Sequence, residues 1–168
     1  MLFSIVLMFA SFERTKVWTN SGTLWTDVID KYPFVLNETS EAIEVRQTGA
    51  EVAYKNRGNF YRENGDSSAA MNDYLVLVKA RVKDPLIYSN VGNMYALMNK
   101  YDSSLQMYTM ALERNPNTFD VHLNRGITYI KMLDYTNALK DFNQALKLRP
   151  NDVSTLVNLC AAYLNNKN

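Results

Sequence analysis

Two columns of residues recur every 34 positions through the last two thirds of this 168-residue chain. One is a glycine column and the other is a tyrosine column: Gly58, Gly92 and Gly126, and Tyr61, Tyr95, Tyr129 and Tyr163. A strict period of this length is typical of a helical repeat array, in which each unit has an apolar face that only its neighbour can cover. The sequence therefore predicts an all-α fold of stacked helix pairs.

Further columns keep the same register, with large and small residues alternating along each unit. They are Tyr54, Tyr88, His122 and Leu156; Ala70, Ser104 and Ala138; Tyr74, Tyr108 and Phe142; and Leu77, Ala111 and Ala145. Pro116 and Pro150 close two of the units. Over about residues 51–165 this pattern resembles the tetratricopeptide repeat (TPR) family. The resemblance implies a right-handed superhelical array of antiparallel helix pairs, the TPR solenoid or α-α superhelix.

Each column has a physical reason. Glycine and alanine let the two helices of a unit approach closely, while the aromatic side chains fill the space between units. We expect Tyr61, Tyr95 and Tyr129 to occupy equivalent buried positions. Replacing Tyr95 with alanine would then cost roughly 3–5 kcal/mol. The sole histidine, His122, lies in an aromatic column and is interpreted as a packing residue, as is the sole cysteine, Cys160, in the glycine column.

The periodicity predicts helices over residues 50–63, 67–81, 86–98, 101–114, 119–132, 135–148 and 153–165. The spacing from Trp25 to Pro33 equals that from Tyr108 to Pro116, which indicates an orphan half repeat before the array. The predicted organisation is an apolar N-terminal helix at 1–18, the half repeat with an irregular connection at 19–50, three TPR units at 51–152 and a C-terminal capping helix at 153–168.

The segment from Met1 to Phe12 is apolar on all sides, yet a membrane span needs about 20 residues. Two interpretations stay open: a first helix of the array, packed internally or forming a homodimer, and the end of a longer transmembrane helix. Arg14, Trp18, Leu24–Trp25, Tyr32–Pro33 and Asn56–Asn59 resemble the junction of bacterial multi-spanning, glycosyltransferase-like membrane proteins with a TPR tail. That resemblance implies a soluble C-terminal tail, tethered to the membrane in the full-length parent, that positions substrate proteins or oligomerises the parent.

Charge and motif content narrow the functional classes. The net charge of +1, from 18 basic and 17 acidic residues, does not favour nucleic acid as a partner. One histidine and one cysteine give no basis for a metal site. The sequence has no phosphate-binding glycine loop and no nucleophile motif. We therefore predict no cofactor, no catalytic residue and no enzyme activity.

A further column consists of amides: Asn56, Asn90, Asn124 and Asn158, each two residues before the glycine position. In the TPR family the first helix of each unit lines the concave face, so the resemblance places these side chains in a groove. An amide offers a donor and an acceptor and can pair with an extended peptide backbone. TPR superhelices that deliver proteins to a serine and threonine N-acetylglucosaminyltransferase bind peptides through a similar row. The alternative is that asparagine is simply common at this place in the repeat.

The groove is predicted to change character along its length, from a basic end to an apolar third unit. Its candidate peptide-binding residues are Lys55, Asn56, Asn59, Arg62, Asn90, Asn93, Asn124, Leu123, Ile127 and Asn158. A helix of the chain itself could instead fill the apolar part. Repeats that grip the acidic C-terminus of heat-shock chaperones resemble this chain at Lys55, Asn59 and Asn90. Asp120 and Asn124 stand where those repeats carry basic residues, so the clamp is incomplete. The functional prediction is a scaffold that binds a peptide or protein segment.

Overall fold

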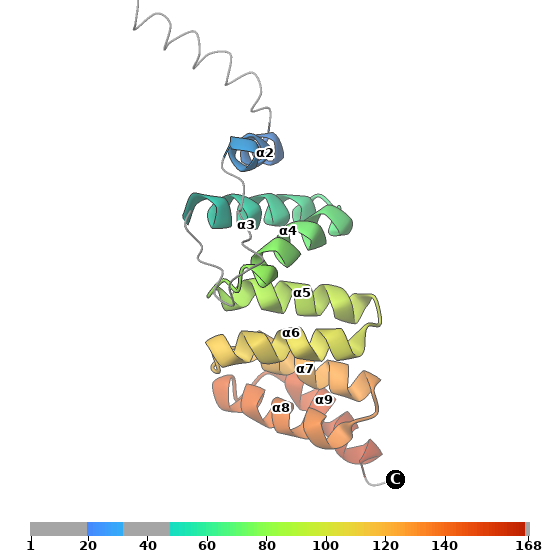
Figure 1. Cartoon of the computed structure of the whole chain (residues 1–168). Coiled ribbons are helices and arrows are strands. Elements are labelled where there is room, and N and C mark those ends of the chain that lie inside the picture. Colours follow the sequence, from blue (N-terminus) through green and yellow to red (C-terminus); the bar gives the residue numbers. More distant parts are fainter. Residues whose placement is uncertain (1–19, 32–47, 167–168) are drawn as a thin grey trace, which may run out of the picture. The chain divides into compact units, whose positions relative to one another are not determined.

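The computed structural model describes residues 20–31 and 48–166, which form eight helices and no strand (Figure 1). The helices are α2 (Ser21–Lys31), α3 (Thr48–Glu63), α4 (Ser67–Lys79), α5 (Pro85–Leu97), α6 (Tyr101–Arg114), α7 (Phe119–Lys131), α8 (Tyr135–Leu148) and α9 (Val153–Asn165). The all-α prediction is confirmed. The chain divides into two compact units between Val82 and Lys83. The predicted helix at 1–18, with the homodimer and membrane tether assigned to it, lies outside the described residues.

The helix bounds follow the 34-residue period closely. Helices α6, α8 and α9 begin and end where the sequence predicts, while α4 ends at Lys79 rather than at residue 81. The reason is that Arg81 adopts a left-handed backbone conformation (φ 51°), which ends the helical ladder. Within units, the turns after α3, α5 and α7 also contain left-handed residues in register, namely Gly65, Asn99 and Leu133.

Aspartate residues cap the N-termini of α4, α8 and α9. The side chains of Asp66, Asp134 and Asp152 accept hydrogen bonds from the backbone N–H groups of Ala69, Asn137 and Thr155 at 2.9, 3.1 and 2.8 Å. These bonds satisfy donors that a helix N-terminus otherwise leaves open. The starts of α4, α8 and α9 are thus fixed by local chemistry as well as by packing, whereas Lys100 at the start of α6 makes no such side-chain bond.

The core of each helix pair is a ring lying on a glycine. Tyr74, Tyr108 and Phe142 are buried, and they face Gly58, Gly92 and Gly126 of the preceding helix. A Cβ atom at Gly92 would lie 2.7 Å from the Tyr108 ring, so only glycine permits this approach. By contrast, Tyr61, Tyr95 and Tyr129 are only half-buried and Tyr163 is 48% exposed. The expectation that Tyr61, Tyr95 and Tyr129 occupy buried positions is wrong, because the second-helix rings occupy that space. Since Tyr95 is only half-buried, we now expect Tyr95→Ala to cost less than the roughly 3–5 kcal/mol of a fully buried aromatic side chain.

The hydroxyl groups of the buried tyrosines are satisfied by asparagines of the first helix. Tyr74 Oη donates to Asn59 Oδ1 and Tyr108 Oη donates to Asn93 Oδ1, each at 2.7 Å. In the third pair both partners change together. The sequence has Phe142 and Ile127 at these positions, and both belong to one apolar cluster around Ala138 and Ala162. Phe142, which has no hydroxyl to donate, thus lies beside Ile127, which has no amide to accept.

Two of the three helix pairs also contain a buried ion pair. Arg57 donates to Asp73 at 2.7 and 2.8 Å, and Arg125 donates to Asp141 at the same two distances. The middle pair has buried Val91 and Met107 at the equivalent positions. The equivalent positions are therefore occupied by an ion pair in two helix pairs and by buried apolar side chains in one.

His122 joins the second of these ion pairs. Its Nδ1 donates to Asp141 Oδ1 at 2.9 Å, and its Nε2 lies 2.9 Å from the carbonyl oxygen of Pro116. A histidine placed this way connects α7 to α8 and to the turn between α6 and α7. Its interpretation as a packing residue is incomplete, because the side chain is 12% exposed but both ring nitrogens also have polar neighbours.

Candidate binding surface

A pocket of about 460 Å³ opens on the second unit, on the faces of α5 and α7. It is lined by Asn93, Ala96, Leu97, Asn99, Tyr101, Tyr108, Asn124, Ile127, Thr128 and Lys131. Three of these, Asn93, Asn124 and Ile127, belong to the predicted groove. The structure thus brings together candidate residues from two successive first helices. We call this the α5–α7 pocket.

Two amides form the polar part of the α5–α7 pocket. Asn93 Oδ1 accepts hydrogen bonds from Tyr108 Oη at 2.7 Å and from Asn124 Nδ2 at 3.0 Å. Burial raises the pKa of the Tyr108 hydroxyl, so at neutral pH it stays protonated and keeps donating. The network fixes both amides while leaving Asn93 Nδ2 and Asn124 Oδ1 without a hydrogen bond among the described residues. One free donor and one free acceptor are what a peptide group requires.

Apolar side chains and one cation surround these amides. Leu97 is 85% exposed, and Ile127 is half-buried against the cluster around Phe142. Lys131, at the C-terminal end of α7, is exposed at the edge of the pocket. This combination can cover an aliphatic side chain, pair with a main-chain amide and attract a carboxylate.

The amide column does not present four equivalent side chains. Asn90 is only 8% exposed, and Asn158 Nδ2 donates to the carbonyl of Ser154 in its own helix at 2.9 Å. Asn56 is half-buried and has no hydrogen bond among the described residues. Of the four, Asn124 lines a pocket. The continuous ladder stays a prediction.

The remaining candidates are placed within their own units. In the first unit, Asn59 is bound to Tyr74, Lys55 is half-buried, and Arg62 is exposed with its guanidinium 3.8 Å from the Glu63 carboxylate. In the second unit, Leu123 packs against the Phe142 cluster. None of the first-unit candidates lines the α5–α7 pocket.

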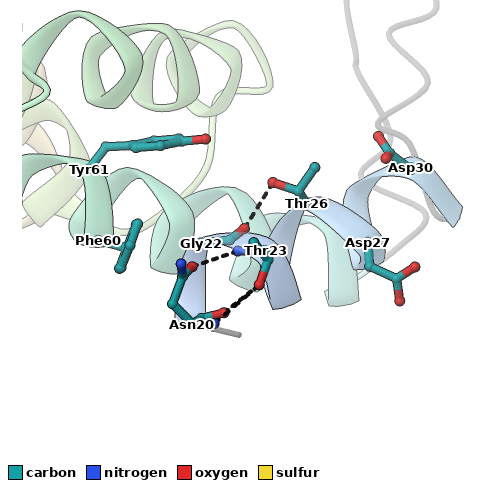
Figure 2. Close-up of a pocket in the computed structure, with 8 residues that line it drawn as sticks. All are labelled: Asn20, Gly22, Thr23, Thr26, Asp27, Asp30, Phe60 and Tyr61. Atoms are coloured by element: carbon teal, nitrogen blue, oxygen red, sulfur yellow. Dashed lines mark hydrogen bonds between the residues drawn. The ribbon is translucent and has the colours of Figure 1, made fainter. Parts of the chain in front are cut away.

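The first unit has a pocket of its own, of about 430 Å³ (Figure 2). Figure 2 shows Phe60 and Tyr61 from α3 facing residues of α2, with hydrogen bonds joining Asn20 to Thr23 and Thr26 to Gly22. Asp27 is paired with Lys31 at 2.8 Å. None of the predicted groove residues lines this pocket, so it lies outside the site that the sequence indicates.

Leu97, Tyr101 and Lys131 also line the α5–α7 pocket, and they were not among the candidates predicted from the sequence. A signal for two of them was present in the helical spacing. Leu97 is four residues after Asn93, and Lys131 is seven after Asn124, so each shares a helix face with a predicted residue. Tyr101 begins the next helix and could be assigned only once the turn geometry was known.

A metal site and a membrane span are two further features that residues 20–31 and 48–166 could form. No group of histidine, cysteine and carboxylate side chains is arranged to hold a metal ion there. Within the same ranges, no helix combines the length and the apolar character required to span a bilayer.

Comparison with known proteins identifies the repeat. The tetratricopeptide repeat family matches residues 85–118 and 119–152. These two segments correspond to the helix pairs α5–α6 and α7–α8, so the predicted repeats are confirmed there. No curated protein sequence matches the chain.

Solved structures share the fold at low sequence identity. The first TPR of Spaghetti (RPAP3), bound to the HSP90 peptide SRMEEVD, is 20% identical with a TM-score of 0.66, over 70% of this chain and 94% of that one. The second TPR domain of human RPAP3, in complex with the HSP70 peptide SGPTIEEVD, is 21% identical with a TM-score of 0.62, over 67% and 94%. A tetratricopeptide repeat protein from Parabacteroides merdae is 17% identical with a TM-score of 0.72, over 97% and 59%. None of these matches supports the glycosyltransferase-like junction.

Proposed function

We propose that the tetratricopeptide repeats at residues 85–152 form a non-catalytic interaction module that binds an extended segment of another protein in the α5–α7 pocket. The observation that carries this proposal is the linked amide pair Asn93 and Asn124, which lies beside the exposed side chain of Leu97. The pair is already oriented by Tyr108, so binding requires little further ordering of these side chains.

The lining indicates which segment would fit. An aliphatic side chain would cover Leu97 and Ile127, while a neighbouring peptide group would pair with the two amides. Lys131 favours an acidic residue, or a terminal carboxylate, next to that anchor. Two of the solved relatives hold peptides that end in Glu-Glu-Val-Asp, which have this combination of acidic and aliphatic residues.

The complete chaperone-type clamp is not part of this proposal. Asp120 lies where that clamp needs a cation, and its carboxylate is 3.8 Å from the guanidinium of Arg149. Both side chains are exposed, so this ion pair is weak and leaves a negative charge near the start of α7. We therefore expect an internal or loosely held acidic segment rather than one fixed by its terminal carboxylate.

The proposal is tested by selecting peptides from a displayed random library and measuring their affinity by calorimetry. Asn124→Ala should weaken the selected peptides about tenfold, since it removes an oriented donor and acceptor. Ile127→Asp should weaken them further, because a carboxylate would replace the apolar wall. Both variants should keep the helical circular dichroism of the parent.

Asn158→Ala is the matched control, because the amide of Asn158 is already bound to its own helix. Its affinity should equal that of the parent. An equal loss in Asn158→Ala and Asn124→Ala would favour the longer amide ladder over a single pocket. Unchanged affinity in both Asn124→Ala and Ile127→Asp would remove the α5–α7 pocket as the binding site.

A further inference from the structure

Helix α2 has the register of a second helix, and residues 20–31 and 48–166 contain no first helix that pairs with it. The matching residues are Ser21, Trp25 and Val28, which correspond to Ser104, Tyr108 and Ala111. The structure supports this alignment on the face turned toward α3. Arg57 Nη1 donates to Thr26 Oγ1 at 3.3 Å, as Arg125 Nη1 donates to Thr109 Oγ1 at 3.2 Å. Helix α2 therefore makes on α3 the contact that α6 makes on α7.

The other face of α2 differs from its counterparts in exposure. In the complete helix pairs, Ser104, Tyr108 and Ala111 are buried because the first helix of the same pair covers them. On α2, Ser21 is exposed, and Trp25 and Val28 are only half-buried. Among the described residues, no first helix covers this face of α2.

Helix α9 has the register of a first helix, and no second helix follows it among the described residues. Its residues Leu156, Cys160 and Tyr163 correspond to His122, Gly126 and Tyr129, and in α7 these three lie toward α8. On α9 the equivalent face is open. Leu156 is 41% exposed, Tyr163 is 48% exposed, and Cys160 is exposed where Gly126 is covered by the Phe142 ring.

We propose that α2 of one copy pairs with α9 of a second copy and thereby completes a helix pair across the junction. The contact would continue the one made three times within the chain, by α3 with α4, α5 with α6 and α7 with α8. Trp25 would lie over Cys160, as Phe142 lies over Gly126. The sulfur is bulkier than glycine, so the indole would sit farther from the helix axis than the phenyl ring does. The pairing is head-to-tail, so it generates a closed ring if the rotation between copies closes and an open chain if it does not.

The test measures the mass of the intact chain over a range of concentrations by light scattering or sedimentation. The parent should form species that grow with concentration. Trp25→Asp on α2 and Leu156→Asp on α9 should each weaken association at least about thirtyfold, since each puts a charge into the centre of the contact. Val28→Asp gives a second α2 variant, should Trp25→Asp lose its helical circular dichroism. Leu97→Asp, on the separate surface of the α5–α7 pocket, should associate like the parent.

Mixing the two blocked variants distinguishes this geometry from any symmetric one. A Trp25→Asp chain keeps an intact α9, and a Leu156→Asp chain keeps an intact α2. Their equimolar mixture should form a heterodimer that grows no further, although each variant alone stays monomeric. Cys160, the only cysteine, should react more slowly with a thiol reagent in the mixture than in the Trp25→Asp variant alone.

Three results would overturn the proposal. The parent could stay monomeric at every concentration, with α9 acting as a solvent-facing cap. The single variants could associate as strongly as the parent. The mixture could fail to form a heterodimer, which would indicate a symmetric contact. Each result is independent of peptide binding, because the Leu97→Asp control changes the α5–α7 pocket and leaves α2 and α9 intact.

Discussion

Phe142→Ala is expected to lower the free energy of unfolding by roughly 3–5 kcal/mol, the range for a fully buried aromatic side chain. The ring has no exposed surface and lies on Gly126, with Ala138 and Ala162 in the same cluster. Glycine and alanine side chains cannot extend into the space that the ring leaves. The cavity would therefore persist, and the loss should fall in the upper part of the range.

Tyr129→Ala is the matched control for Phe142→Ala, because it removes an aromatic of the same helix pair that is only half-buried. We expect a loss of roughly 1–2 kcal/mol. Repeat arrays can unfold in parts, so urea unfolding should be accompanied by hydrogen exchange of the α7 and α8 amides. Equal losses in the two variants would mean that the tyrosine column contributes as much to the core as the second-helix rings do.

Asp141→Ala should cost about 3 kcal/mol. The carboxylate is buried and accepts two hydrogen bonds from Arg125 and one from His122. Its removal leaves the guanidinium of Arg125 without its partner in a poorly solvated position. We choose the lower end of the range for a broken buried pair because the Arg125 side chain keeps 19% exposure and can turn toward water. Chemical unfolding at neutral pH measures the effect.

The middle helix pair provides the control for Asp141→Ala. The double variant Arg125→Val with Asp141→Met copies Val91 and Met107, which are buried at the equivalent positions and carry no charge. Replacing both members of a buried ion pair with apolar residues is often neutral or stabilising. The double variant should therefore lie within about 1 kcal/mol of the parent. A double variant as unstable as Asp141→Ala would show that the network, rather than an unpaired charge, sets the stability.

The parent and the double variant should also differ in how their stability depends on pH in acid. Burial alone would raise the pKa of Asp141, but the hydrogen bonds from Arg125 and His122 outweigh it and hold that pKa below its usual value. A carboxyl with a lower pKa when folded stabilises the fold above its unfolded pKa of about 3.9, and this stabilisation is lost as the pH falls through the folded pKa. Below about pH 4, the parent should therefore lose stability more steeply with falling pH than the double variant.

The period of 34 residues predicted the helices well because it reports a geometric constraint that every unit shares. The period could not indicate which of the aromatic side chains within a unit is the more deeply buried. Tyr95 and Tyr108 both belong to columns that recur every 34 residues, yet Tyr108 is buried and Tyr95 is half-buried, since only the second-helix ring lies on a glycine. The early end of α4 was also hidden, because the left-handed residue Arg81 is not a glycine or an asparagine.

The lining of the α5–α7 pocket was predicted in part. The register correctly placed Asn93, Asn124 and Ile127 on first helices, but it said nothing of their hydrogen-bond partners. Asn158 donates to its own helix, whereas Asn124 donates to Asn93, although both occupy the same column. Side-chain pairing depends on the neighbouring helix, and that neighbour differs from unit to unit. A column of identical residues is therefore a weaker guide to a site than a face of adjacent ones.

The paired change from Tyr108 and Asn93 to Phe142 and Ile127 couples the interior of a repeat to its outer wall. Restoring tyrosine at position 142 alone would strand a hydroxyl beside an isoleucine, and restoring asparagine at 127 alone would strand an amide beside a phenyl ring. We therefore expect substitutions at positions 127 and 142 to occur together. Since Ile127 also lines the α5–α7 pocket, the residue at position 142 in the interior influences whether this part of the pocket wall is apolar or polar. If the proposed function holds, a change of ligand preference at this wall would require a substitution at position 142, which does not itself line the pocket.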